Sequence, residues 1–167
     1  MKTFVVLGMH RSATSLVAKG LHDNDVSVGD NLLGATACNP YGHWEDKAFI
    51  RMNDRILQAA GGSWRNPPSE IDIVNVGYDI KDDIKALVGH RREDLWGWKD
   101  PRTTLTIRCY LPHLVNPHFV CVFRDVREVA LSLQRRDKMP FEEGKRLAHE
   151  YNRRLLGFLR EWYLGCL

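Results

Sequence analysis

A short stretch near the N-terminus combines several residue types that can bind an anion. Arg11 is followed by the hydroxyl side chains of Ser12, Thr14 and Ser15, between an apolar run and a helical pattern. Backbone N–H groups at the start of a helix attract anions, and hydroxyls and a guanidinium add further donors. Helix capping by Ser12 or Thr14 alone does not account for an arginine and three hydroxyls together. The loop is therefore predicted to bind a phosphate group.

This loop lacks the lysine of the nucleotide triphosphatases. Counted from Gly8, the pattern G-x-x-x-x-G-K-[ST] would have its second glycine at Ala13 and its lysine at Thr14. That lysine reaches the β- and γ-phosphates, so its absence argues against an ATPase or a GTPase. A small-molecule kinase of the phosphate-loop type is kept as an alternative.

The elements that must position the loop alternate between strands and helices, which predicts one α/β domain over residues 1–167 with a parallel sheet. The expected strands are Thr3–Gly8, Leu95–Lys99 and His118–Phe123, all of them buried. Helices are expected around Leu16–Leu21, Glu45–Ala60 and Asp79–Val88, from Asp100 to Pro112, around Val126–Leu133, and over Phe141–Leu164. The stretches Asp23–Tyr41 and Ser63–Gly77 are expected to be irregular. The expected walls of a substrate pocket are Asp25–Asn39 and Ser63–Gly77.

Three stretches should meet at the carboxyl edge of this sheet, where α/β proteins bind ligands. They are the loop after Gly8, the residues after Lys99 and the turn at Arg124. Any chemistry is expected there.

Four segments in this order are similar to those of a known family. They are His10–Ser15, Asn39–Glu45, Trp98–Arg102, and Arg124 with Ser132 eight positions later. The chain resembles the bacterial-type sulfotransferases that use PAPS (3′-phosphoadenosine-5′-phosphosulfate), from Thr3 to about Leu164. The resemblance implies a three-layer α/β/α fold with a central parallel sheet, related to that of the phosphate-loop nucleotide triphosphatases.

The resemblance also implies which residues hold PAPS. The 5′-phosphosulfate would lie on His10, Arg11, Ser12, Ala13, Thr14 and Ser15, and the 3′-phosphate on Arg124 and Ser132. Arg11 would stabilise the leaving phosphate, since such a transfer depends on alignment and charge stabilisation and needs no metal. Two alternatives stay open: Arg124 could pair with Asp125 or Glu128, and Ser132 could be an ordinary helical serine. The acceptor would be a small molecule or a carbohydrate, and PAP would be the product.

Transfer to a hydroxyl or amine also requires a general base. Glu45 is the first candidate, on the resemblance, although a glutamate at a helix start also complements the helix dipole. His43 is the second candidate because imidazole titrates near neutral pH. Asp100 is the third, with helix capping as its alternative. Lys99 could neutralise sulfonate oxygens or pair with Asp100.

Two features depart from the family. Ala13 replaces a family glycine and would be strained by about 1 kcal/mol if its φ is positive. Members usually continue beyond the long helix, whereas this sequence ends at Leu167, so a catalytically inactive PAP-binding module is a second alternative. A chain without that edge element is also expected to be able to pair as a homodimer.

Composition sets the class of protein. The 167 residues have a net charge of +3, which argues against a nucleic-acid-coating protein, and no apolar run is long enough to cross a membrane. The pairs Arg91–Arg92, Arg135–Arg136 and Arg153–Arg154 are expected to be mostly solvated. Cys38, Cys109, Cys121 and Cys166 form no C-x-x-C pair, which predicts reduced, mostly buried thiols in a cytoplasmic protein.

Overall fold

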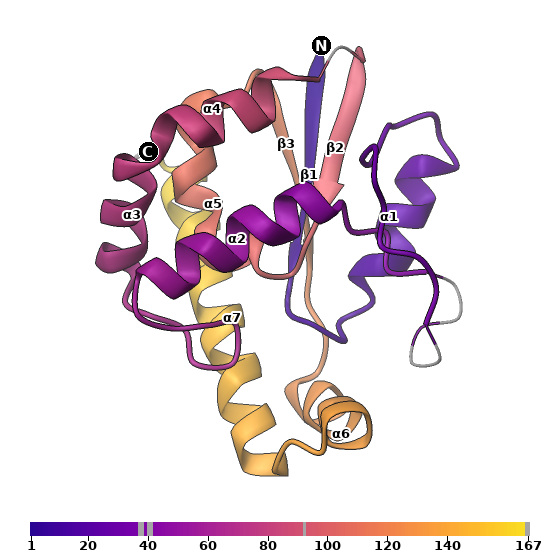
Figure 1. Ribbon diagram of the computed structural model, residues 1–167. Helices are drawn as coiled ribbons and strands as arrows, with labels where there is room; N and C mark the ends of the chain where they lie inside the picture. Colours follow the sequence, from indigo (N-terminus) through magenta and orange to yellow (C-terminus); the bar gives the residue numbers. More distant parts are fainter. Residues whose placement is uncertain (37–38, 40–41, 92, 166–167) are drawn as a thin grey trace.

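Three parallel strands form the sheet in the computed structural model, which describes residues 1–36, 39, 42–91 and 93–165 (Figure 1). They are β1 (Lys2–Gly8), β2 (Leu95–Lys99) and β3 (Pro117–Val122), in the order β2-β1-β3. The register pairs Val6 with Lys99 and Gly8 with Val122. All three predicted strands are confirmed, and their carboxyl ends lie at one edge of the sheet.

Helices cover both faces of β1, as its continuous apolar run predicts. Val5 and Leu7 belong to the main core, where Phe49 stacks on Trp98 at 4.3 Å between ring centroids. Val6, whose side chain alternates with theirs, is buried on the opposite face. Figure 1 shows α1 (Thr14–His22) on one side of the sheet and α2 (Lys47–Ala59), α5 (Thr103–Tyr110) and α7 (Phe141–Tyr163) on the other.

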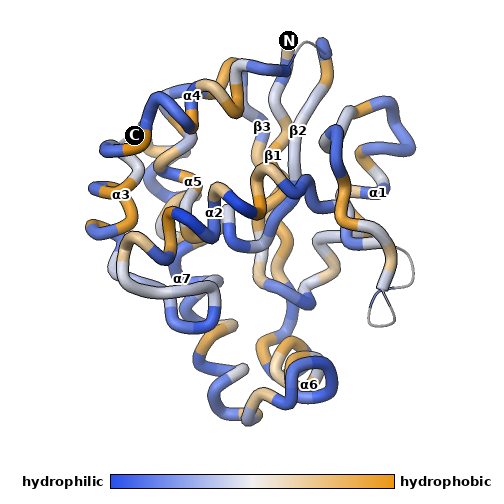
Figure 2. Tube along the Cα trace, in the orientation of Figure 1, coloured by the Kyte–Doolittle hydropathy of each residue, from blue (hydrophilic) through white to orange (hydrophobic). Residues whose placement is uncertain are grey.

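The remaining helices are α3 (Glu70–Asp79), α4 (Lys81–Gly89), α6 (Val126–Asp137) and the short 3₁₀ helix η1 (Leu111–His113). Hydrophobic and hydrophilic residues alternate along α2 and α7 (Figure 2). On α7 the residues Leu147, Tyr151 and Leu155 of the predicted stripe are buried.

The expectation that Ser63–Gly77 is irregular is wrong, because α3 occupies its second half. Ser69 caps this helix by accepting a hydrogen bond from the N–H of Asp72 at 3.2 Å. Gly77 then allows close packing on α5: an added Cβ would lie 2.5 Å from Sγ of Cys109. The packing of α3 against α5 stabilises α3, and the spacing of residues within Ser63–Gly77 does not show this contact. In contrast, the described part of Asp23–Tyr41, which follows α1, forms no helix or strand.

Other predicted boundaries shift because acidic side chains cap the helices differently. Asp46 accepts from the N–H of Ala48 at 2.7 Å, so α2 begins at Lys47 rather than Glu45. Asp100 accepts from the N–H of Arg102 at 3.1 Å, and α5 begins only at Thr103. The expectation that β3 is fully buried is also wrong: it is a half-buried strand that pairs with β1 alone in the described part of the chain.

Two arginines expected at solvated faces are buried. Arg91 binds Asp46 at 3.0 Å and also binds Asp30, which fastens the segment after α1 to the start of α2. Arg154 donates to the carbonyl of Pro68 at 2.7 Å and to Glu150 at 2.6 Å.

Cys109 is a buried free thiol and Cys121 a half-buried one, whereas Cys38 and Cys166 lie outside the described residues, as does part of the segment Asn39–Glu45. Within residues 1–36, 39, 42–91 and 93–165, no helix has the length and apolarity needed to cross a membrane.

Candidate functional site

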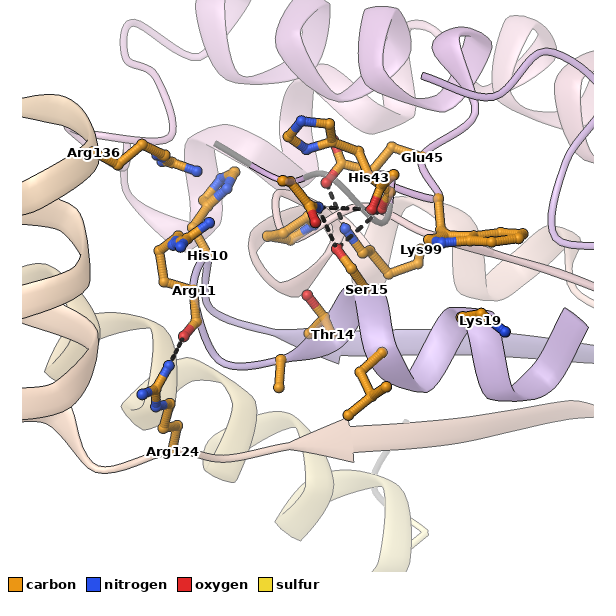
Figure 3. Close-up of a pocket in the computed structure, with 16 residues that line it drawn as sticks. His10, Arg11, Thr14, Ser15, Lys19, His43, Glu45, Lys99, Arg124 and Arg136 are labelled. Atoms are coloured by element: carbon orange, nitrogen blue, oxygen red, sulfur yellow. Dashed lines mark hydrogen bonds and ion pairs between the residues drawn. The ribbon is translucent and has the colours of Figure 1, made fainter. Parts of the chain in front are cut away.

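A cavity of about 480 Å³ opens at the carboxyl edge of the sheet (Figure 3). The central strand β1 has β2 on one side and β3 on the other, so its carboxyl end is the switch point at which α/β sheets bind ligands. The loop after β1, the end of β2 and the turn after β3 all contribute to the lining, together with residues 42–45. The prediction that these stretches meet is confirmed.

The loop after β1 contains two residues with left-handed backbone conformations, Arg11 at φ 67° and Ala13 at φ 73°. Ser12 and Thr14 do not cap α1: its N-cap is Ala13, no side chain caps it, and the Ser12 hydroxyl donates to the carbonyl of Met9 at 2.6 Å. N–H groups in the first turn of a helix have no intrahelical acceptor. Figure 3 shows the hydroxyls of Thr14 and Ser15 turned towards the cavity. Helix capping therefore does not account for these hydroxyls, of which that of Ser12 donates to Met9 and that of Ser15 donates to the carbonyl of His43 at 3.1 Å.

Ala13→Gly is expected to raise the free energy of unfolding by about 0.5–1 kcal/mol, because glycine relieves the left-handed strain at Ala13. Ala86→Gly is the matched control, since Ala86 is exposed within α4 and its replacement should destabilise by about 1 kcal/mol. Urea unfolding of both variants measures whether the free energy of unfolding rises or falls in each. Destabilisation by Ala13→Gly of the same size as by Ala86→Gly would show that Ala13 is not strained.

Arg11 meets Ser132 and Arg124 across more than a hundred residues of sequence. Nε of Arg11 donates to Oγ of Ser132 at 2.8 Å, and Nη1 of Arg124 donates to the carbonyl of Arg11 at 2.9 Å. Ser132 is a buried serine of α6, and this hydrogen bond gives it a partner outside its own helix. Arg124 also pairs with Glu128 at 3.3 Å, as one alternative expected, whereas Asp125 caps α6. The loop and the Arg124–Ser132 pair therefore form one basic site, in which Arg11 and Arg124 line the cavity and Ser132 does not.

Glu45 and Lys99 form a buried ion pair in the wall of the cavity. Oε1 of Glu45 lies 2.5 Å from Nζ of Lys99, and their side chains are 8% and 2% exposed. Glu45 precedes α2 and makes this pair, so it does not serve as a first-turn residue of that helix. Burial raises the pKa of Glu45 and lowers the pKa of Lys99, although each charge opposes the shift of the other. Both shifts narrow the gap between the two pKa values.

His43 and Asp100, the other candidate bases, lie in different surroundings. The Nε2 atom of His43 is 3.0 Å from the hydroxyl of Thr36, and burial followed by the charge of Lys99 lowers its pKa. Asp100 is fully buried, where Asn53 donates to it at 2.9 Å and Arg102 at 2.9 Å. His43 lines the cavity and Asp100 does not, so the geometry favours Glu45 and His43 as bases.

His10 lies in the cavity wall with its ring 4.4 Å from that of Trp64. Its Nε2 atom is buried and has no hydrogen-bond partner among the residues that the structure describes. Burial, followed by the nearby charges of Arg102 and Arg136, holds the pKa of His10 well below its ordinary value. His10 is therefore a neutral imidazole at physiological pH.

This neutral imidazole makes stability depend on pH in a defined direction. Below about pH 6.5 the unfolded chain takes up a proton at His10 that the folded protein excludes. Stability is therefore lost as the pH falls from 6.5 towards the lower folded pKa, by up to about 1.4 kcal/mol per pH unit. His10→Gln should remove this part of the slope in urea unfolding between pH 7 and pH 5, whereas His149→Gln, at an exposed position, is the control. An unchanged slope in His10→Gln would contradict this expectation.

Two cations that line the cavity were not predicted as site residues. Lys19 lies four residues after Ser15 on α1, where it pairs with Asp23 at 2.5 Å, and Arg136 lies four residues after Ser132 on α6. Residues four apart share a helix face, so both could have been found by extending the predicted site one helical turn. Among the described residues, no cluster of His, Cys, Asp and Glu is arranged to hold a metal ion.

Comparisons with protein-family models, with curated proteins and with solved structures find no match to this chain. Its function must therefore be inferred from the chemistry of the cavity.

Proposed function

We propose that the protein is a PAPS-dependent sulfotransferase of α/β/α architecture, which transfers the sulfuryl group of PAPS to a hydroxyl or amine of a small-molecule or carbohydrate acceptor. One observation carries the proposal: Arg11, in the loop before α1, is hydrogen-bonded to Ser132 on α6 and accepts from Arg124 after β3. A ligand with two separate anionic groups can contact both halves of this basic site at once.

The two anionic ends of PAPS match the two halves of the site. The 5′-phosphosulfate would lie at the first turn of α1, where N–H groups, Thr14 and Ser15 can donate to it. The 3′-phosphate would lie on Arg124 and Ser132. This assignment directs the sulfuryl group towards Lys99 and Glu45, which line the same cavity.

Transfer requires one bond to form and one to break. The acceptor oxygen bonds to sulfur, the bond from sulfur to the bridging phosphate oxygen breaks, and PAP leaves with that electron pair. Arg11 stabilises the charge that develops on the leaving oxygen, and Lys99 neutralises the sulfonate oxygens. The acceptor proton passes to Glu45, whose pKa is raised by burial, or to His43.

The experiment is a transfer assay with ³⁵S-labelled PAPS and a panel of sugars, phenols and amines, in which labelled product and PAP are both measured. The proposal predicts equal amounts of both, dependent on acceptor. Tight binding of PAP without transfer to any acceptor would support the inactive module instead. The strained backbone at Ala13 is an argument for that alternative. Phosphoryl transfer from ATP to the same panel would support the kinase alternative and contradict the proposal.

A further inference from the structure

The proposed nucleotide contacts leave two cationic residues of the cavity lining unused, Lys19, which pairs with Asp23, and Arg136. Arg136 lies one helical turn beyond Ser132 on α6 and lines the cavity beside His10. Figure 3 shows Arg124 and Arg136 on opposite sides of Arg11. If the 3′-phosphate lies on Arg124, Arg136 faces the part of the cavity that the nucleotide does not fill.

The guanidinium of Arg136 is held in place before any ligand arrives. Asp137 accepts from Nε at 2.8 Å and from Nη2 at 2.6 Å, and the group lies 5.9 Å from the ring centre of Trp64. Its side chain is 18% exposed. Among the residues that the structure describes, none accepts a hydrogen bond from Nη1. Nη1 is therefore the donor that this fixed, half-buried guanidinium can offer to an anionic group.

The cavity lining has more cationic than anionic side chains, although Arg136 itself is paired at 2.6 Å with Asp137, which does not line the cavity. The cationic residues lining the cavity are Arg11, Lys19, Lys99, Arg124 and Arg136, whereas Glu45 is its one carboxylate within the described part of the chain. Glu45 is already paired with Lys99. Nε2 of His10, next to Arg136, is also buried without a partner among described residues, which leaves a second polar atom for a ligand.

Arg136 also lies near a candidate base. His43 lines the same cavity as Arg136, together with Lys99 and Arg11. An acceptor whose hydroxyl faced His43 or Glu45 would reach Arg136 with another part of the molecule.

We propose that Arg136 binds an anionic group of the acceptor, so that the preferred substrates are hydroxylated small molecules bearing a carboxylate, such as uronic-acid sugars or hydroxy acids. This inference rests on the proposed function and adds a substrate class to it. The binding energy of the carboxylate would position the hydroxyl beside the base, which is how remote contacts assist a reaction.

The test uses two pairs of probes that differ by one carboxylate: methyl β-glucoside against methyl β-glucuronide, and p-cresol against 4-hydroxyphenylacetate. Binding is measured by calorimetry on the protein saturated with PAP. The carboxylated member of each pair should bind about 10- to 100-fold more tightly, the range of a hydrogen bond to a charged group. Arg136→Gln should abolish this preference, whereas the binding of PAP should change less than about 3-fold.

Arg135→Gln is the matched control, because it removes an equal charge from an exposed neighbour that does not line the cavity and should keep the preference. Arg136→Lys keeps the charge but not the fixed guanidinium, so it should keep part of the preference, which would show that the helix is intact. The inference is overturned if neutral members bind as well as charged ones, if neither charged member binds, or if Arg136→Gln weakens PAP as much as Arg124→Gln does. If the wild type binds no PAP, the proposed function fails by itself, and the same comparison on the ligand-free protein decides about Arg136.

Discussion

Replacing Arg11 by alanine is expected to lower the rate of sulfuryl transfer by about 10²- to 10³-fold, the usual effect of removing one donor to a developing oxyanion. Arg11 is placed to act on the leaving phosphate, and its left-handed backbone accommodates alanine no worse than arginine. The fold should persist, since loss of the partly buried hydrogen bond to Ser132 costs about 1 kcal/mol. Steady-state transfer at saturating PAPS and a urea unfolding curve measure the two effects.

Arg127→Ala is the control for Arg11→Ala, because Arg127 is an exposed arginine in the first turn of α6 outside the cavity lining. It should leave transfer within about 2-fold of wild type. Near-normal turnover in Arg11→Ala would refute the role of this arginine.

Glu45→Gln is expected to reduce turnover by about 10²- to 10⁴-fold with little change in PAP affinity, because it removes the candidate base and leaves the nucleotide contacts intact. The variant also leaves Lys99 buried without its partner, which should cost about 3–5 kcal/mol of stability. Glu45→Gln therefore lowers both stability and turnover, so its effect on each must be measured separately.

The double variant Glu45→Gln/Lys99→Met separates them. Removing both charges should restore most of the stability, since a buried pair can be replaced by apolar groups at little cost, yet transfer should stay as low as in Glu45→Gln. Recovery of transfer together with stability would show that the pair is structural. An equal loss of turnover and PAP affinity in Glu45→Gln would assign the base role to His43.

The strands and the place of the site were predictable because both follow from simple patterns. Thr3–Gly8 is a continuous apolar run that ends on a glycine, and the added Cβ of any other residue at Gly8 would lie 2.7 Å from the carbonyl of Val122. Parallel strands end at a common edge, so residues after Gly8 and Lys99 had to lie near each other. The positions of Arg11 and Arg124 at that edge follow from the same rule.

The partners within the site were not predictable, because they depend on how separate elements pack. One of the two alternatives for Lys99 was an ion pair with its neighbour Asp100, but Lys99 pairs with Glu45, 54 residues away, and Asp100 binds Arg102. The bond from Arg11 to Ser132 spans 121 residues. No periodic pattern in the sequence links the two members of either pair. Only the folded backbone shows that the loop has an alanine at φ 73°.

The central claim, that one adenylate ligand is held at both phosphates, is tested most directly by titrating the wild-type protein and an Arg124→Gln/Ser132→Ala variant with PAP and with ADP. ADP carries the 5′-phosphates but no 3′-phosphate. The account predicts that the wild type binds PAP about 10- to 100-fold more tightly than ADP and that the variant loses this preference while its affinity for ADP is kept. Equal affinities of the wild type for PAP and ADP would contradict it.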